Sequence, residues 1–439
     1  MDAQQKIHTM LSCISRHGVS REERKNLLPE RATASAAVQE EAGPDKQARL
    51  SLWVSAIGFG IEGFDLLVLV FILAAISASF GLSTTRAASL MTGTLLGAVT
   101  GGIAFGFLSD ALGRVRVLTW TIVLFGVFTG LCAISRGYWD LLAYRTIAGL
   151  GFGGEFGIGL ALVAETWPAH LRARASSYVA LGGQAGIFAA AFLTPLLLPH
   201  IGWRGMFVIG MLPVGLSFGL RRMLPEPKIF LETIAHGRTA APIRLLFKDR
   251  ATIRISIGML ILCSVQQVGY YGLMTWLPYY LSMRHGLSLT RSAIWTAVTV
   301  VGMSCGIWIF GELADRVGRR PSFFTFQAMA AVMVICYSRL TAPAALLVGG
   351  AVMGLFVNGM LGGYGTLISE LYPTEVRATA QNLFFNVGRA VGGFGPLMIG
   401  FLAARYSFAT AIALLAALYG VDILATAFLI PETRGASLL

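Results

Sequence analysis

The sequence contains Gly106-Phe-Leu-Ser-Asp110-Ala-Leu-Gly113-Arg114, and 205 residues later it contains the counterpart Gly311-Glu-Leu-Ala-Asp315-Arg-Val-Gly318-Arg319. A second pair of motifs keeps the same distance: Glu165-Thr-Trp-Pro168-Ala-His-Leu-Arg172 corresponds to Glu370-Leu-Tyr-Pro373-Thr-Glu-Val-Arg377. Two separate motifs are very unlikely to keep one offset through unrelated residues by chance. The chain is therefore predicted to consist of two homologous halves.

The composition indicates a membrane protein. Of the 439 residues, 55% are hydrophobic and 13% are charged, whereas soluble domains carry about 25% charged residues. This excludes a disordered chain, a secreted disulfide scaffold and an ordinary cytosolic enzyme. The five cysteines match no metal site and no redox pair.

Twelve apolar segments are long enough to cross a bilayer as helices, and continuous apolar runs of this length do not fit the alternating strands of a barrel. The segments are 51–76, 87–109, 117–134, 139–164, 176–198, 203–220, 254–281, 290–311, 322–339, 342–368, 380–402 and 407–430. The predicted fold class is an all-α integral membrane protein with twelve transmembrane helices in two six-helix repeats.

The distribution of basic residues predicts the orientation. With the N-terminus inside, cytoplasmic segments hold 25 of the 34 lysine and arginine residues, so both termini are expected in the cytoplasm of a multi-pass inner-membrane protein. No apolar signal region precedes the first span. The expected organisation is a cytoplasmic tail (1–50), an N-terminal bundle (51–222), a cytoplasmic linker (223–250), a C-terminal bundle (251–431) and a short cytoplasmic tail (432–439). We expect a monomer in the lipid bilayer with no nucleic-acid partner.

The motif that follows spans 2 and 8 resembles the signature of the major facilitator superfamily, and the resemblance covers residues 51–434. The span 4 motif Arg145-x-x-x-Gly149-x-x-x-Gly153 is similar to the proton-linked motif of that superfamily. Pro225-Glu-Pro-Lys-Ile-Phe and Pro431-Glu-Thr-Arg-Gly resemble the ends of the two halves in sugar and metabolite porters. Glu62-Gly-Phe-Asp65, Gly153-Gly-Glu155 and Glu165-x-Trp-Pro-x-His-x-Arg172 look most like the sialate:proton and metabolite:proton symporter branches. The resemblance implies a secondary active transporter that works by alternating access, and not an enzyme.

The repeated loop motifs are candidate gating elements. A carboxylate at a helix end can face the positive end of a neighbouring helix or an arginine, and the resemblance implies that such a latch stabilises the outward-open state. The alternative is that basic loops simply anchor the topology. The candidate gating residues are Gly106, Asp110, Gly113, Arg114, Arg116, Asp315, Arg319, Glu165, Arg172, Glu370 and Arg377.

Charged residues inside the spans are candidates for proton coupling, because burying a charge in a bilayer is costly. A rise of about 1.5 Å per residue places Asp65 and Arg145 at nearly the same depth, so the two can pair. Glu62 lies one turn from Asp65 on the same helix face. Glu155 is replaced by Met360 in the other half. The alternatives are a static Asp65–Arg145 ion pair and a hydrogen bond from Glu155 within its glycine-rich helix.

A second group of polar residues forms the candidate substrate site. Arg389 lies near the middle of span 11 as a lone cation, and guanidinium binds carboxylate in a bidentate manner. The alternative is a structural ion pair with a carboxylate from the other half. The remaining candidates are amide and phenol side chains that could bind hydroxyl groups, namely Gln266, Gln267, Tyr270 and Gln184, the last being the repeat counterpart of Arg389.

These residues predict proton-coupled symport, in the uptake direction, of a small organic anion such as a carboxylate. The proton is the coupling ion, and we expect neither a cofactor nor a metal. The alternatives are a sugar or polyol carrier, a proton-coupled antiporter that exports a metabolite or drug, and a receptor that uses the same fold without turnover. Asp422, near the inner end of span 12, is expected to snorkel to the membrane surface.

Overall fold

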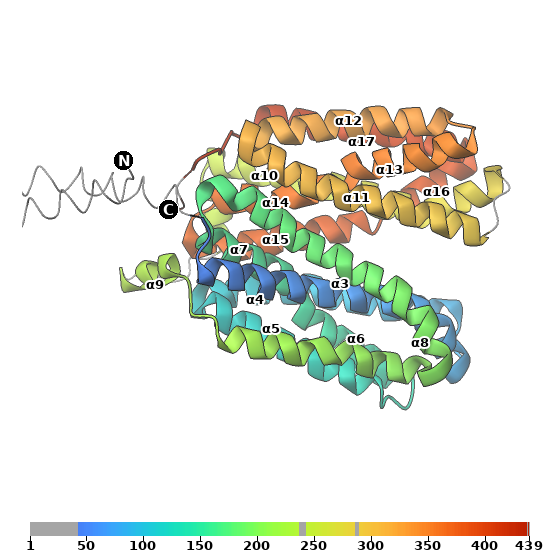
Figure 1. Ribbon diagram of the computed structural model, residues 1–439, viewed down its shortest axis with the longest axis horizontal. Coiled ribbons are helices and arrows are strands. Elements are labelled where there is room, and N and C mark those ends of the chain that lie inside the picture. The colour runs from blue at the N-terminus through green and yellow to red at the C-terminus, as the bar shows by residue number, and fades with distance from the viewer. Residues whose placement is uncertain (1–42, 237–242, 286–288, 437, 439) are drawn as a thin grey trace, which may run out of the picture.

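The computed structural model describes residues 43–236, 243–285, 289–436 and 438, and every regular element in these ranges is a helix. The helices form two bundles that lie side by side (Figure 1). Helix α3 begins and α17 ends at the same end of the molecule. Most of the predicted N-terminal tail, residues 1–42, lies outside the described residues.

The first bundle contains the six predicted spans. Its elements are α3 (Lys46–Phe80), α4 (Thr84–Leu112), α5 (Arg114–Cys132), α6 (Tyr138–Gly153), α7 (Glu155–Thr166), η1 (Ala169–Leu171) and α8 (Arg172–Arg222). Helix α3 starts inside the predicted tail, because the Asp45 carboxylate accepts a hydrogen bond of 2.7 Å from the Ala48 amide and caps the helix. The fourth span is interrupted at Gly154, between α6 and α7.

Helix α8 contains two spans. The backbone reverses at Gly202, whose φ of 65° is a left-handed conformation that glycine adopts readily. Figure 1 shows the two arms of α8 running antiparallel to each other. Eleven segments of the described residues are long and apolar enough to cross a membrane, and one of them, Ala169–Met211, runs through this reversal. Counting both arms of α8, the twelve predicted spans are confirmed.

The second bundle repeats the first. Its elements are α10 (Arg250–His285), α11 (Leu289–Val317), α12 (Arg319–Arg339), α13 (Pro343–Gly359), α14 (Leu361–Leu371), η3 (Thr374–Val376), α15 (Arg377–Gly392), α16 (Gly395–Arg405) and α17 (Phe408–Leu429). The segment between the bundles carries α9 (Lys228–Ala235) and η2 (Ile243–Phe247).

Glycines bring equivalent helices together in both bundles. A Cβ added at Gly97 or Gly101 of α4 would collide with the α6 backbone at Thr146 and Leu150. Their counterparts Gly302 and Gly306 of α11 meet the α13 backbone in the same way. Small residues allow helix backbones to approach closely where no hydrophobic driving force exists between helices in lipid. These glycines therefore set the close contact between the paired helices in each half.

Candidate functional site

One ion pair joins the two bundles halfway along the membrane spans. Arg389 of α15 donates a hydrogen bond from Nη2 to Oε1 of Glu62 on α3 over 2.6 Å. The two residues are buried, with 6% and 2% of their surface exposed. Arg389 is therefore not the lone cation that the sequence predicts, because the other half supplies its partner. Glu62 Oε2 and Arg389 Nε find no hydrogen-bond partner among the described residues.

The repeat gives this pair an uncharged counterpart. The 205-residue offset relates Glu62 to Gln267 and Gln184 to Arg389. Each half thus contributes one charged residue and one glutamine at equivalent positions. Both glutamines are buried, and Gln184 Oε1 has no partner among the described residues. The centre of the molecule therefore presents a carboxylate, a guanidinium and two amides.

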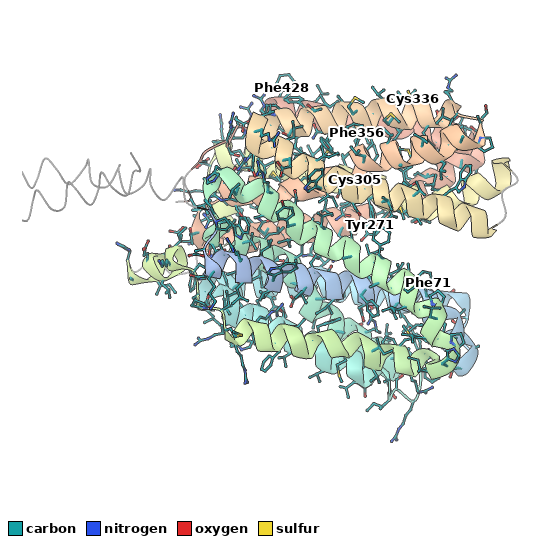
Figure 2. All side chains as sticks on the ribbon, in the orientation of Figure 1. Phe71, Tyr271, Cys305, Cys336, Phe356 and Phe428 are labelled. Atoms are coloured by element: carbon teal, nitrogen blue, oxygen red, sulfur yellow. The ribbon has the colours of Figure 1, made fainter. Side chains whose placement is uncertain are left out.

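Aromatic side chains surround Arg389. Its guanidinium lies 4.9 Å from the centre of the Phe385 ring. Phe385 packs against Phe156 of α7 and Phe156 against Phe59 of α3, both as tilted ring pairs with 4.2 Å between ring centres. Tyr271 interacts electrostatically with Arg389 and lies between the bundles in Figure 2. An apolar column beside a guanidinium can hold the apolar body of an acid while the arginine binds its carboxylate.

Tyr270 and Gln266 have different surroundings. Tyr270 interacts electrostatically with Arg389 and makes an edge contact with the neighbouring Tyr271. Gln266 points into its own half, where Nε2 donates to Asn358 Oδ1 over 2.8 Å. Only Gln267 of the two adjacent glutamines occupies the position equivalent to Glu62. The structure thus separates Gln266 from the central pair.

Neither the aromatic column nor Asn358 is among the residues predicted from the sequence. One available signal was the spacing of Phe385, one helical turn before Arg389. The remaining members come from other helices.

Asp65 and Arg145 form the contact that their equal depth predicts. Arg145 donates to both carboxylate oxygens of Asp65, at 2.9 and 2.7 Å, and Nε donates to Thr94 at 3.3 Å. Both partners belong to the first bundle, on α3 and α6. Breaking this pair would therefore change the packing inside one half, without directly separating the halves.

Glu155 also pairs inside the first bundle, and it is not bonded within its glycine-rich helix as the alternative proposed. Arg221 Nη2 donates to Glu155 over 2.6 Å, and Thr121 donates to the other carboxylate oxygen over 2.7 Å. Arg221 is 1% exposed, although it lies just beyond the predicted end of the span 203–220. The repeat replaces this charged pair by Met360 and Thr426. This joint replacement is the signal that could have identified Arg221.

The repeated aspartates cap helices of the opposite half. The Asp110 carboxylate accepts hydrogen bonds from the amides of Ala378 and Thr379 at 3.1 and 2.8 Å, at the start of α15. Asp315 accepts from the amides of Ala173 and Arg174 at 3.1 and 3.0 Å, at the start of α8. A carboxylate at a helix N-terminus also interacts with the helix dipole. Two equivalent contacts therefore hold the bundles together at the end where α3 begins.

A second pair of carboxylates reinforces this end. Glu165 accepts from Arg114 of its own half at 3.0 Å and from Arg377 of the other half at 2.8 Å. The equivalent Glu370 accepts from Arg319 at 2.8 Å and from Arg172 of the other half at 3.0 Å.

The glycines of the motif allow these contacts. A Cβ at Gly106 would lie 3.0 Å from the Ala378 carbonyl oxygen of the other half. Gly113 has a φ of 116°, and its counterpart Gly318 has 118°, which lets one helix end and the next begin at once.

Arg116 does not have the predicted place in this latch. Its side chain is exposed, and its backbone amide donates to Glu226 at 3.0 Å. Glu226 belongs to the Pro225-Glu motif, and Glu432 of the equivalent motif caps Arg319 and Arg320 in the same way. The two Pro-Glu motifs therefore cap the helices that follow the latch.

The predicted position of the Asp422 side chain at the membrane surface is wrong. Its side chain does not snorkel but is fully buried inside the second bundle, with 0% of its surface exposed. Neither of its carboxylate oxygens has a hydrogen-bond partner among the described residues. Among the described residues no group of three or more His, Cys, Asp and Glu side chains could hold a metal ion.

Removing the Asp110 and Asp315 carboxylates tests whether they hold the two bundles together. Each carboxylate–helix contact is worth about 0.3–2 kcal/mol, so Asp110→Asn combined with Asp315→Asn is expected to open this end in a larger share of molecules. Spin labels at Leu112 and Val317, exposed and equivalent in the repeat, would report a population at longer distance.

The matched control for the latch is Asp249→Asn. This exposed aspartate caps α10 through the Thr252 amide at 2.8 Å, within the second half alone. An unchanged distance distribution in the double variant, or an equal change in the control, would contradict the assigned role of the aspartates.

Comparison with known proteins agrees with this architecture. The chain matches the profile of the Major Facilitator Superfamily over residues 52–337 and 290–438. A metabolite transport protein of Haemophilus influenzae is 61% identical over 391 residues, covering 88% of this chain and 96% of the relative. A sialic acid transporter of Escherichia coli is 27% identical over 411 residues, covering 89% and 97%. The solved proton:xylose symporter XylE, bound to 6-bromo-6-deoxy-D-glucose, has the same fold, with a TM-score of 0.73, 20% identity and coverage of 89% and 97%.

The family and both sequence relatives are transporters and not enzymes. The predicted resemblance to the metabolite and sialate branches is confirmed. From the twelve spans, the internal repeat and the matching family profile, we conclude that this chain is a multi-pass membrane protein of the Major Facilitator Superfamily and a transporter of metabolites.

Proposed function

We propose that this protein imports a small organic anion together with a proton. The observation that carries the proposal is the Glu62–Arg389 pair, because it joins the two halves at mid-membrane and contains a carboxylate that can accept a proton. Alternating access requires the halves to change their contact around a central site. A contact between the halves that depends on protonation would link this change to a proton gradient.

In the proposed cycle the substrate carboxylate replaces Glu62 as the partner of Arg389. A proton binds Glu62, removes its negative charge and weakens the 2.6 Å ion pair. Arg389 then binds the incoming carboxylate, and the central site keeps its net charge. One proton thus accompanies one carboxylate, so transport of a monovalent acid is electroneutral.

The other candidates have supporting roles in this proposal. Gln184, Gln267 and Tyr270 would bind the polar groups of the substrate, while Gln266 supports the second half through Asn358. Asp65 and Glu155 have arginine partners within the first half. We assign them the task of transmitting a protonation change to the packing of that half.

The relatives support an acid as substrate, since one of them transports sialic acid. The basic residues support placing the termini in the cytoplasm, because 25 of 34 lie on that side in this orientation. With that orientation the latch joins the bundles at the cytoplasmic end, which supports an outward-facing state.

A second candidate function is the uptake of a sugar or polyol. The two buried glutamines at equivalent positions favour it, because amides donate to and accept from hydroxyl groups.

The test is uptake into proteoliposomes that are alkaline inside, with labelled carboxylates and sugars offered as a panel. Accumulation of an acid that collapses with a protonophore is the expected result. Accumulation of a sugar instead would indicate that the buried glutamines, and not Arg389, bind the substrate. Efflux of preloaded compounds against an acid exterior, without uptake, would show that the protein exports its substrate.

A further inference from the structure

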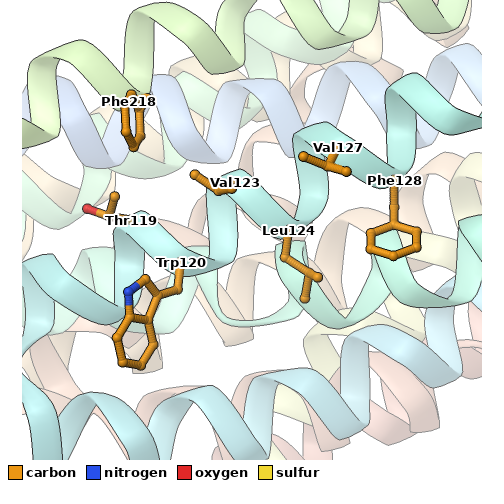
Figure 3. Close-up of a pocket in the computed structure, with 7 residues that line it drawn as sticks. All are labelled: Thr119, Trp120, Val123, Leu124, Val127, Phe128 and Phe218. Carbon is orange, nitrogen blue, oxygen red and sulfur yellow. The ribbon is translucent and has the colours of Figure 1, made fainter.

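A groove of about 460 Å³ lies on the outer surface of the first bundle, away from the central site. It runs between α5 and the second arm of α8 and is lined by apolar side chains, including Trp120, Val123, Val127 and Phe218 (Figure 3). The first three are 40% to 51% exposed. In a membrane-spanning bundle such a surface faces lipid.

The two helices contact each other on both sides of the groove. In their outer parts they touch, since a Cβ on Gly126 would collide with Val214 and one on Gly130 with Met211. Nearer to the end of the molecule where α5 begins, the Arg221 guanidinium donates to the Leu118 carbonyl of α5. Between these contacts Gly215 and Gly219 are exposed and carry no side chain.

Two arginines stand at the open end of the groove. The Arg222 guanidinium lies 4.4 Å from the centre of the Phe218 ring, which lines the groove. Arg116 lies one turn before Trp120 on α5, on the same helix face. Both side chains are exposed, and neither forms an ion pair with a described residue. The groove thus combines an apolar slot with two exposed arginines at its mouth.

The second half does not repeat this arrangement. The counterparts of Arg116, Trp120 and Arg222 are Pro321, Thr325 and Ala427. There α12 is joined to α17 by a hydrogen bond of 2.8 Å from Gln327 to Thr426. Because both halves have the same fold, the fold itself does not require the two arginines.

We propose that this groove binds an anionic glycerophospholipid of the leaflet on the side of the termini. Its phosphate lies between Arg116 and Arg222, and one acyl chain lies along Trp120 and Val123 beneath Phe218. Basic residues between transmembrane helices bind anionic headgroups, and tryptophan is favoured at the membrane interface. Arg222 directly follows Arg221, which binds Glu155, so the bound lipid braces the arm of α8 that holds this buried pair.

Native mass spectrometry of the full-length protein tests the site. The detergent-extracted protein is first incubated with equal amounts of phosphatidylglycerol and phosphatidylcholine of the same chain length. The wild type is expected to retain phosphatidylglycerol preferentially as one tightly bound copy. A basic residue near an anionic lipid contributes about 1 kcal/mol, so each arginine removed lowers the affinity about fivefold. Arg116→Gln with Arg222→Gln should therefore abolish the preference.

The matched control is Arg316→Gln, which removes an exposed arginine at the same end of the second half. Trp120→Ala tests the apolar slot and should weaken retention of both lipids while leaving the headgroup preference. Equal retention of both lipids by the wild type would overturn the proposal. An unchanged preference in the double variant, or a preference lost equally in the control, would also overturn it. Unaltered thermal unfolding of each variant in lipid-free detergent confirms that folding is preserved.

Discussion

Arg389→Gln is expected to lower kcat/KM for carboxylate uptake by about 100-fold, since truncating one member of a buried, hydrogen-bonded charge pair costs 2–5 kcal/mol or more. Arg389 is the cation whose guanidinium joins the halves at mid-membrane, beside the Phe385 ring. Glutamine keeps a polar side chain of similar reach but cannot bind a carboxylate through a charged fork. The measurement is the initial rate of labelled acid uptake into proteoliposomes across a range of concentrations.

Arg389→Lys is the informative control. It retains the positive charge but not the paired donors, so an intermediate loss is expected. Gln184→Asn changes the repeat counterpart by one methylene and should alter selectivity among acids more than the maximal rate. Retained affinity for the acid in Arg389→Gln would remove Arg389 from the substrate site and leave it as a structural link between the halves.

The second large effect is expected for Glu62→Gln. With one proton per anion, a pH difference of one unit supports about tenfold accumulation of the acid. Glutamine imitates the protonated carboxyl permanently, so accumulation should fall to equilibration while exchange of labelled for unlabelled acid continues. The two assays use the same vesicles, with and without a pH gradient.

Asp65→Asn tests the competing assignment, in which Asp65 and not Glu62 carries the coupling proton. Asp65 lies one turn away on the same helix and also pairs with an arginine, but that arginine belongs to the same half. If Asp65→Asn loses accumulation and keeps exchange while Glu62→Gln keeps both, the coupling proton belongs to Asp65. Loss of exchange in Glu62→Gln would instead make the carboxylate a binding residue.

Much of the architecture follows from local sequence. The twelve spans are apolar runs whose length is set by the bilayer, and the 205-residue offset relates one half to the other. The latch aspartates were also found, since a repeated carboxylate at a helix end has few uses other than capping or pairing. Asp65 and Arg145 were matched by depth alone, because both helices cross the same membrane and rise by a constant amount per residue.

The tertiary structure alone decided which buried charges join the halves. Periodicity gives the depth of a residue but not the rotation of its helix against a helix of the other bundle. Glu62, Asp65 and Glu155 therefore remained equivalent as candidates, although only Glu62 meets an arginine of the second bundle. The partnership of Glu155 with Arg221 depends on the arm of α8 that returns after Gly202. The physical reason is that a charge in a membrane is satisfied by whichever partner packing brings within about 3 Å, and residues far apart in the sequence supply that partner.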